Sequence, residues 1–206
     1  FVDERKASLA VIEVASGVFR QVLPAPVVMR SFRVSPDGRH AIFVAPTPDT
    51  LGVIGQEKTE TFVVPLAAGP ARRVLAGGEG LTFWWSPDGR RLLFKREGRL
   101  MAVPVEGGDA APFLPGLVAP VGEPIWSPDG TRFVSLVPDP SVRDPELELV
   151  PPGMYTVARP FMDLYLVSSA DGSARNLTSA FDDQVSSPAW SPDGEAVFFV
   201  ATNSQS

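Results

Sequence analysis

The chain has 206 residues, 44% of them hydrophobic, with 22 prolines, 18 glycines and a formal net charge of −6. The hydrophobic content suffices for a packed core and argues against wholesale disorder, and the spread of proline and glycine indicates many turns between short strands. The 18 lysines and arginines form no run longer than two residues, which argues against a nucleic-acid partner, and the absence of cysteine excludes disulfides and thiolate metal sites.

The first predicted element is a β-hairpin over residues 9–23, with a small glycine-containing turn at residues 15–17. The residues before it lack the charged n-region and apolar h-region of a signal peptide. The compartment therefore stays open between periplasmic or secreted and cytoplasmic. No apolar run reaches the roughly 20 residues that span a bilayer, so membrane insertion is not expected.

A Ser-Pro-Asp-Gly tetrapeptide occurs four times, at residues 35–38, 86–89, 127–130 and 191–194. Its proline presets φ at about −65°, its aspartate suits a type I turn, and its glycine accepts the left-handed conformation that closes a hairpin. An apolar run follows each copy. Tryptophan precedes three copies, as Trp85, Trp126 and Trp190, and Val34 precedes the first. Each copy is predicted to join two antiparallel strands, with the tryptophan filling space between neighbouring sheets.

A second hairpin with a glycine turn follows each of the first three copies, over residues 61–75, 100–114 and 163–177. If the four strands of one unit are named A to D, the tetrapeptide joins A to B and the glycine turn joins C to D. The chain then reads C-D, three complete units and a final A-B, which is four sheets' worth of strands. Because one such sheet cannot bury both faces, the units are expected to stack radially.

The predicted fold is therefore an all-β β-propeller of four-stranded antiparallel blades, with four blades' worth of strands. The propeller is either a closed four-bladed ring or part of a larger one. Residues 1–206 are expected to form a single β-propeller region, with blade pieces at about 1–23 together with 188–206, 30–75, 82–114 and 123–177.

The long connections are the predicted working surface. The A–B and C–D turns lie on one face of such a sheet, and the irregular B–C and D–A connections lie on the other, where binding residues usually reside. The connections 137–161 and 178–187 supply the candidate partner or substrate contacts, which are Arg143, Tyr155, Arg159, Phe161, Phe181, Asp182 and Asp183. The alternative interpretation is a solvated loop with surface ion pairs of little energetic value.

The sequence offers no catalytic machinery. His40 is the only histidine and there is no Gly-x-Ser-x-Gly elbow, so a serine hydrolase triad is absent. The four tetrapeptide aspartates are explained by their role in the turns. The pair Asp182-Asp183 lacks the ligand spacing of a cation-binding loop. No phosphate-binding glycine loop occurs, and no catalytic, cofactor or metal residue is assigned. The adjacent Trp84 and Trp85 are expected in the core rather than on a ligand platform.

The repeat resembles a known class. Trp-Ser-Pro-Asp-Gly followed by an apolar strand, together with the segment from Asp163 to Thr178, is similar to the TolB-type propeller repeat. That repeat occurs in periplasmic TolB proteins and in the N-terminal propellers of prolyl-oligopeptidase-family (S9) serine peptidases. The glutamate pair with which dipeptidyl-peptidase propellers hold a substrate amine has no counterpart here.

The resemblance implies two functions. The first is a non-catalytic propeller that gates and selects peptide substrates for an α/β-hydrolase domain of the same parent chain, and that domain is absent from these residues. The alternative is a TolB-like extracytoplasmic scaffold that binds protein partners. A stand-alone ligand-binding, lectin-like propeller is a weaker third reading. Whether the chain belongs to an enzyme is left open by its sequence.

Overall fold

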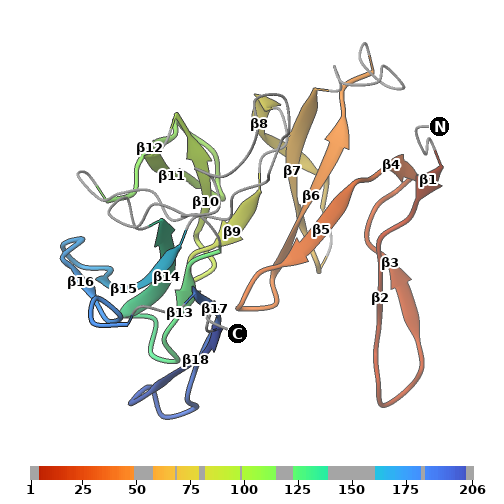
Figure 1. Cartoon of the computed structure of the whole chain (residues 1–206). Coiled ribbons are helices and arrows are strands. Elements are labelled where there is room, and N and C mark those ends of the chain that lie inside the picture. Colours follow the sequence, from red (N-terminus) through yellow and green to blue (C-terminus); the bar gives the residue numbers. More distant parts are fainter. Residues whose placement is uncertain are drawn as a thin grey trace, which may run out of the picture. The chain divides into compact units, whose positions relative to one another are not determined.

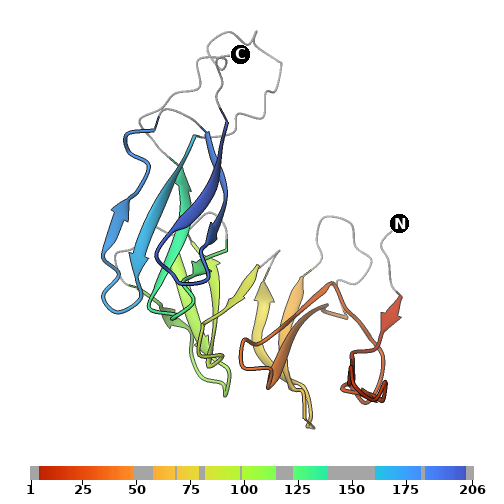
Figure 2. The same ribbon diagram turned by 90° about the horizontal axis from the view of Figure 1, so that it is seen from below.

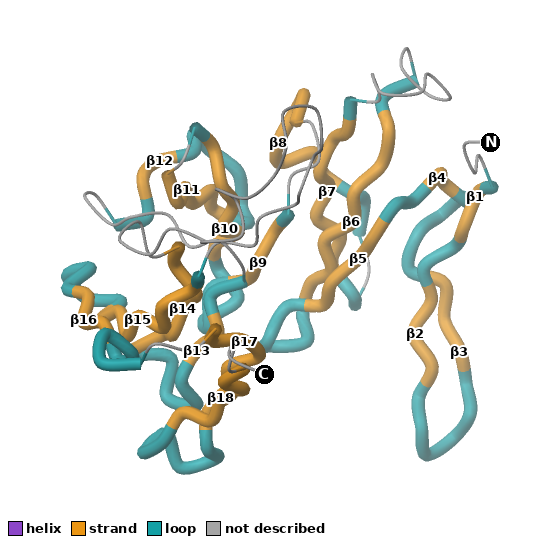
Figure 3. The backbone as a smooth tube through the Cα atoms, in the orientation of Figure 1, coloured by secondary structure: helices purple, strands orange, loops and turns teal. Residues whose placement is uncertain are grey.

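The computed structural model describes residues 5–48, 58–67, 69–78, 82–97, 99–114, 123–138, 161–181 and 184–202. Within these ranges the regular structure consists of β-strands alone (Figures 1 and 3). No helix in the described part of the chain is long and apolar enough to cross a bilayer. The described strands form three four-stranded and three two-stranded sheets, in which neighbouring strands pair in antiparallel fashion, for example residues 83–85 with 92–94 and residues 40–46 with 59–65.

Each four-stranded sheet follows the chain in a simple up-and-down order. The first contains β5 (Ser31–Val34), β6 (His40–Pro46), β7 (Thr59–Pro65) and β8 (Arg72–Gly78). The second contains β9 (Phe83–Trp85), β10 (Arg91–Arg96), β11 (Arg99–Pro104) and β12 (Ala111–Pro112). The third contains β13 (Ile125–Trp126), β14 (Arg132–Pro138), β15 (Met162–Ser168) and β16 (Ala174–Asn176). The prediction of four-stranded antiparallel blades is confirmed.

The remaining strands form two-stranded sheets. These pair β1 (Lys6–Ala7) with β4 (Val27–Val28), β2 (Ala10–Ile12) with β3 (Phe19–Gln21), and β17 (Gln184–Trp190) with β18 (Val197–Thr202). The β1–β4 pair was not predicted from the sequence. The hairpins β2–β3 and β17–β18 are separate sheets in this structure. Their predicted union in one blade stays a prediction.

The chain divides into two compact units, each described by itself. The first comprises Phe1–Lys95 and Met101–Ala111, and the second comprises Arg96–Leu100 and Pro112–Ser206. In the second unit, the β17–β18 hairpin contacts β14 and β15, the central strands of the third sheet (Figure 2).

The four tetrapeptide turns have the geometry predicted from their residues. In the first copy, the Gly38 N–H donates to the Ser35 carbonyl at 2.9 Å, and the φ of Gly38 is 68°. The Ser35 hydroxyl donates to Asp37 Oδ1 at 2.6 Å, and the same oxygen accepts the Arg39 N–H at 3.0 Å. The other three copies repeat this arrangement, with φ values of 66°, 70° and 75° at their glycines. The turns are thus held by their own side chains, independently of what surrounds them.

Neighbouring sheets pack through apolar side chains on their facing surfaces. In the first unit, residues of β6 and β7 share one buried cluster with residues of β9, β10 and β11, whose members include Ile42, Val63, Phe83, Trp85, Phe94 and Val103. In the second unit, Val134 and Leu164 of the third sheet pack with Val185 of β17. Trp84 and Trp85 are both buried, as predicted.

Two of the three tryptophans that precede a tetrapeptide also link sheets by a hydrogen bond. Trp85 Nε1 donates to the carbonyl of Arg33, the residue before Val34, at 3.4 Å. Trp190 Nε1 donates to the carbonyl of Ile125, the residue before Trp126, at 2.8 Å. Each of these two indoles therefore reaches the same repeat position of another sheet, whereas Trp126 Nε1 is buried without a hydrogen-bond partner in the described part of the chain.

Candidate functional site

A pocket in the first unit lies on the face of the short turns. It has a volume of about 730 Å³. Its wall is formed by the β5–β6 turn, the β9–β10 turn and the residues that follow β11. The charged and titratable side chains that line it are Asp37, Arg39, His40, Asp88, Arg90, Arg91 and Glu106.

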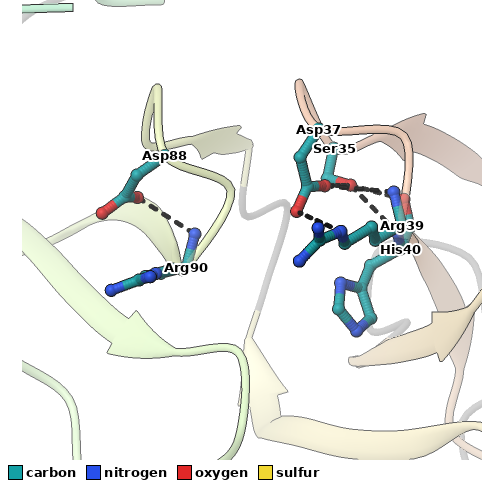
Figure 4. A network of polar contacts seen from close by, with 6 residues as sticks. All are labelled: Ser35, Asp37, Arg39, His40, Asp88 and Arg90. Carbon is teal, nitrogen blue, oxygen red and sulfur yellow. Dashed lines mark hydrogen bonds and ion pairs between the residues drawn. The ribbon is translucent and has the colours of Figure 1, made fainter.

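The β5–β6 turn holds the first part of the wall in place. Asp37 is fixed by the Ser35 hydroxyl and the Arg39 N–H (Figure 4). The Arg39 carbonyl accepts the Leu66 N–H at 2.8 Å. The Arg39 backbone is thus bonded on both sides. Its guanidinium Nε lies 4.0 Å from Asp37 Oδ2, and its side chain is 80% exposed. An exposed pair at this distance contributes little, so the guanidinium is available to other anions.

The β9–β10 turn repeats this arrangement on the second part of the wall. The Arg90 N–H donates to Asp88 Oδ1 at 3.0 Å (Figure 4). The Arg90 carbonyl accepts the Val105 N–H at 2.9 Å. The two turns touch at Gly89. A Cβ built on this glycine would lie 3.0 Å from Asp37 Cγ, so only glycine allows the turns to approach so closely.

The turn hydrogen bonds keep both carboxylates ionised. The Ser35 hydroxyl and the Arg39 N–H hold the pKa of Asp37 below its ordinary value of 3.8. Burial opposes ionisation of Asp88, but hydrogen bonds from the Ser86 hydroxyl and the Arg90 N–H outweigh it and lower its pKa as well. Asp37 and Asp88 are therefore negatively charged at neutral pH.

The charged side chains of the pocket are suited to binding. The nearby hydroxyls of Ser35 and Ser86 are engaged with Asp37 and Asp88. His40 Nδ1 is covered and forms no hydrogen bond within the described part of the chain, so no base is paired with a nucleophile here. Among the described residues, no group of three or more histidines and carboxylates could hold a metal ion. Charged side chains around a pocket can bind and orient a charged ligand.

Most of the residues predicted as contacts lie outside the described ranges. Arg143, Tyr155, Arg159, Asp182 and Asp183 are among them. Phe161 lies half-buried just before β15. Phe181 is 50% exposed and meets the ring of Phe199 edge-on, with ring centroids 5.7 Å apart. Their role as partner or substrate contacts stays a prediction.

Sequence reasoning missed the pocket because it treated each tetrapeptide as a self-contained turn. The face of short turns offered no irregular sequence to attract attention. A signal was nevertheless present. Arginine follows the turn glycine in the first two copies, as Arg39 and Arg90, whereas threonine and glutamate occupy this position in the other two.

Comparisons with known proteins agree on the fold. No family model matches the chain. Along 97% of its length it is similar to the crystal structure of TolB from Acinetobacter baumannii, with a TM-score of 0.58 and 17% sequence identity, over 44% of that structure. Along 98% it is similar to Porphyromonas gingivalis dipeptidyl peptidase 4, with a TM-score of 0.61 and 13% identity, over 34% of that chain.

The chain has the fold of a TolB-type β-propeller. At these identities the structural likeness is one of fold alone. A curated relative is the uncharacterized peptidase YuxL of Bacillus subtilis (strain 168), which is 35% identical over 139 residues. The match covers 57% of the present chain and 21% of that peptidase. The chain therefore spans less than half of the length of each of these three proteins.

Proposed function

We propose that this β-propeller is the non-catalytic part of a prolyl-oligopeptidase-like serine peptidase. In this role it gates and selects peptide substrates for an α/β-hydrolase domain that the 206 residues do not contain. The observation that carries the proposal is the 35% sequence identity to a peptidase over 139 residues. These 206 residues contain the propeller repeat but no catalytic triad. Repeated sheets that pack through apolar faces supply a rigid wall, while the chemistry belongs to another domain.

Two further parts of the proposal concern residues at the ends of the sheets. The connections 137–161 and 178–187 would contact peptide through Arg143, Tyr155, Arg159 and their neighbours, because long connections on a rigid scaffold commonly carry binding. Residues 1–23 and 188–206 would share one blade, since the first supplies a C-D hairpin and the second an A-B hairpin.

The test uses the parent protein that contains these residues. Its remaining sequence should hold a Gly-x-Ser-x-Gly elbow followed by aspartate and histidine, and the purified parent should cleave short peptide substrates faster than long ones. Removal of the propeller should abolish this length preference while the hydrolase domain, provided that it folds, keeps cleaving small esters. The 206-residue chain alone should cleave neither. A parent without the elbow, or cleavage by the isolated chain, would overturn the proposal.

The alternative function is a protein-binding scaffold like TolB. It is supported by the structural similarity to TolB, with a TM-score of 0.58 over 97% of the chain. A scaffold would bind a protein partner without any hydrolase in the parent. The same reading of the parent sequence separates the two functions, because a signal peptide without a hydrolase domain supports the scaffold and contradicts the peptidase.

A further inference from the structure

Comparison of the four tetrapeptide copies shows which neighbouring residues the turn itself requires. The residue after the turn glycine is Arg39 in the first copy, Arg90 in the second, Thr131 in the third and Glu195 in the fourth. In all four copies its N–H donates to the turn aspartate at 3.0 or 3.1 Å. The turn therefore needs only the backbone of this residue. The arginine side chains of the first two copies require a separate explanation.

Both arginines line one pocket. Close approach of the two turns, which depends on Gly89, places Asp37 beside the second turn and brings Arg39 and Arg90 into the wall of the same hollow. The N–H and the carbonyl of Arg39 are hydrogen-bonded to Asp37 and Leu66, and those of Arg90 are hydrogen-bonded to Asp88 and Val105. Because both backbones are fixed, an anion that binds here has to order only the arginine side chains, and a guanidinium group can form a charge-assisted hydrogen bond to it.

The other charges of the pocket limit which anion fits. Arg91 adds a third positive charge, whereas Asp37, Asp88 and Glu106 bring three negative ones. Asp37 and Asp88 each direct one carboxylate oxygen into their own turn, where it accepts two hydrogen bonds. A ligand with several negative charges would meet these carboxylates at close range. A group with a single charge can pair with guanidinium at lower electrostatic cost.

We propose that this pocket binds one carboxylate group of a peptide between Arg39 and Arg90. The choice of a peptide rests on the proposed function, whereas the choice of a monovalent carboxylate rests on the pocket. The apolar stems of the arginines and the side chains of Pro104 and Val105 supply contact for the residue that bears the carboxylate. The pocket would thus recognise the carboxyl terminus or an acidic side chain of a peptide that the propeller admits.

The experiment measures binding of N-acetyl-tetra-alanine to the 206-residue chain by isothermal titration and by the NMR shifts of the arginine Nε–H groups. The peptide with a free carboxylate should bind, and its C-terminal amide should bind at least about tenfold more weakly, as loss of a hydrogen-bonded charged group implies. Inorganic phosphate should bind more weakly than the free-acid peptide. Tighter binding of phosphate, or equal binding of acid and amide, overturns the proposal.

Variants locate the site. The double substitution Arg39→Gln and Arg90→Gln should reduce affinity for the free-acid peptide by about tenfold or more. Arg175→Gln removes the same charge from an exposed position of β16 outside the pocket and should leave affinity unchanged. Arg39→Lys retains the charge and should retain part of the affinity, which guards against a folding defect in the double variant. Equal loss in the double variant and in Arg175→Gln would refute the site.

The result is independent of the test of proposed function. The binding measurement needs no hydrolase, so absence of binding refutes the pocket and leaves length selection by the parent protein intact. Conversely, a parent without a hydrolase domain refutes the peptidase role, while carboxylate binding by the chain would still stand.

Discussion

The β9–β12 sheet and the β2–β3 hairpin are built from the same repeat but differ in what covers them. In β10, Leu92, Leu93 and Phe94 are completely buried. In the hairpin, Ile12 is 63% exposed and Phe19 is 72% exposed. Both segments have the apolar and aromatic residues expected of strands. The difference teaches that the repeat specifies a strand, whereas burial of that strand depends on a neighbouring sheet.

The largest predicted effect comes from cutting back an aromatic ring in each region. Phe94→Ala should lower the free energy of unfolding by about 3–5 kcal/mol, because it removes a fully buried ring and leaves a cavity. Phe19→Ala should cost less than about 0.5 kcal/mol, since that ring is already mostly in water. Urea unfolding followed by tryptophan fluorescence measures both. Similar losses in the two variants would mean that the hairpin is covered in solution, and the comparison would fail.

The strands and turns of the described sheets were largely predictable from sequence because their signals are local. The tetrapeptide predicted a left-handed glycine in all four copies, and this is where the structure places them. Pairing of Leu92 with Trp85 and of Phe133 with Trp126 follows directly from these turns, because a short hairpin loop fixes the register.

The candidate site was not predictable in the same way. The pocket depends on contact between Asp37 and Gly89, which are 52 positions apart in the numbering and belong to different sheets. No local pattern encodes such a contact. The start of β17 at Gln184 was also missed, because the predicted strand was anchored on Pro188 and Trp190, whereas the ladder continues through the irregularity between Ser186 and Ala189.

The second prediction compares the stability contribution of the turn glycines in the β9–β10 turn and the β2–β3 turn. Gly89→Ala should destabilise the protein by about 2–3 kcal/mol, because alanine is strained at a φ of 66° and its Cβ would crowd Asp37 at 3.0 Å. Gly17→Ala in the β2–β3 turn, at a φ of 70° with nothing within 4 Å, should cost only the backbone strain of about 1–2 kcal/mol. Thermal and urea unfolding of both variants give the difference. If Gly17→Ala were the more damaging change, close approach of the two tetrapeptide turns would not be important for stability.

The third prediction concerns two arginines at equivalent positions, three residues after the turn glycines Gly17 and Gly69. Arg72 donates to the carbonyl of Val105, a buried residue, and Arg20 donates to the carbonyl of Leu66 at an exposed site. Arg72→Met should cost about 1–2 kcal/mol, since a hydrogen bond with a charged donor is lost at a partly buried carbonyl. Arg20→Met should cost less than about 0.5 kcal/mol because water replaces the lost donor.

Unfolding of single variants at low and high salt concentration tests the role of Arg72 further. The effect of Arg72→Met should change little between low and high ionic strength, because the partner is a neutral carbonyl rather than a carboxylate. The matched control is Arg73→Met, which breaks the 2.6 Å ion pair with Glu60 and should lose part of its effect as salt rises. Equal salt dependence in the two variants would contradict the assigned role of Arg72.

The smallest predicted effect is a pKa shift at a turn. The Ser127 hydroxyl, the Thr131 N–H and the Thr131 hydroxyl all donate to Asp129 and lower its pKa from 3.8 to about 2. Because the folded pKa lies below the unfolded one, this aspartate stabilises the fold above about pH 4, and the contribution disappears as the pH falls through about 2. Thr131→Val removes the hydroxyl donor and should raise the pKa of Asp129, as followed by NMR titration of its carboxyl carbon.

The fourth copy supplies the control for this titration. Its Asp193 has a pKa lowered by the Ser191 hydroxyl and the Glu195 N–H, without any side-chain donor at the position equivalent to Thr131. Thr131→Val should therefore leave the pKa of Asp193 unchanged. In the β2–β3 turn the Glu13 carboxylate accepts the Ser16 hydroxyl, whereas each tetrapeptide aspartate also accepts a backbone N–H, so acid should weaken the backbone of the tetrapeptide turns more than that of the hairpin turn. Protection of backbone amides from hydrogen exchange at pH 2.5 and pH 6 separates the two, and loss of protection in the hairpin alone would reverse the expected order of acid sensitivity.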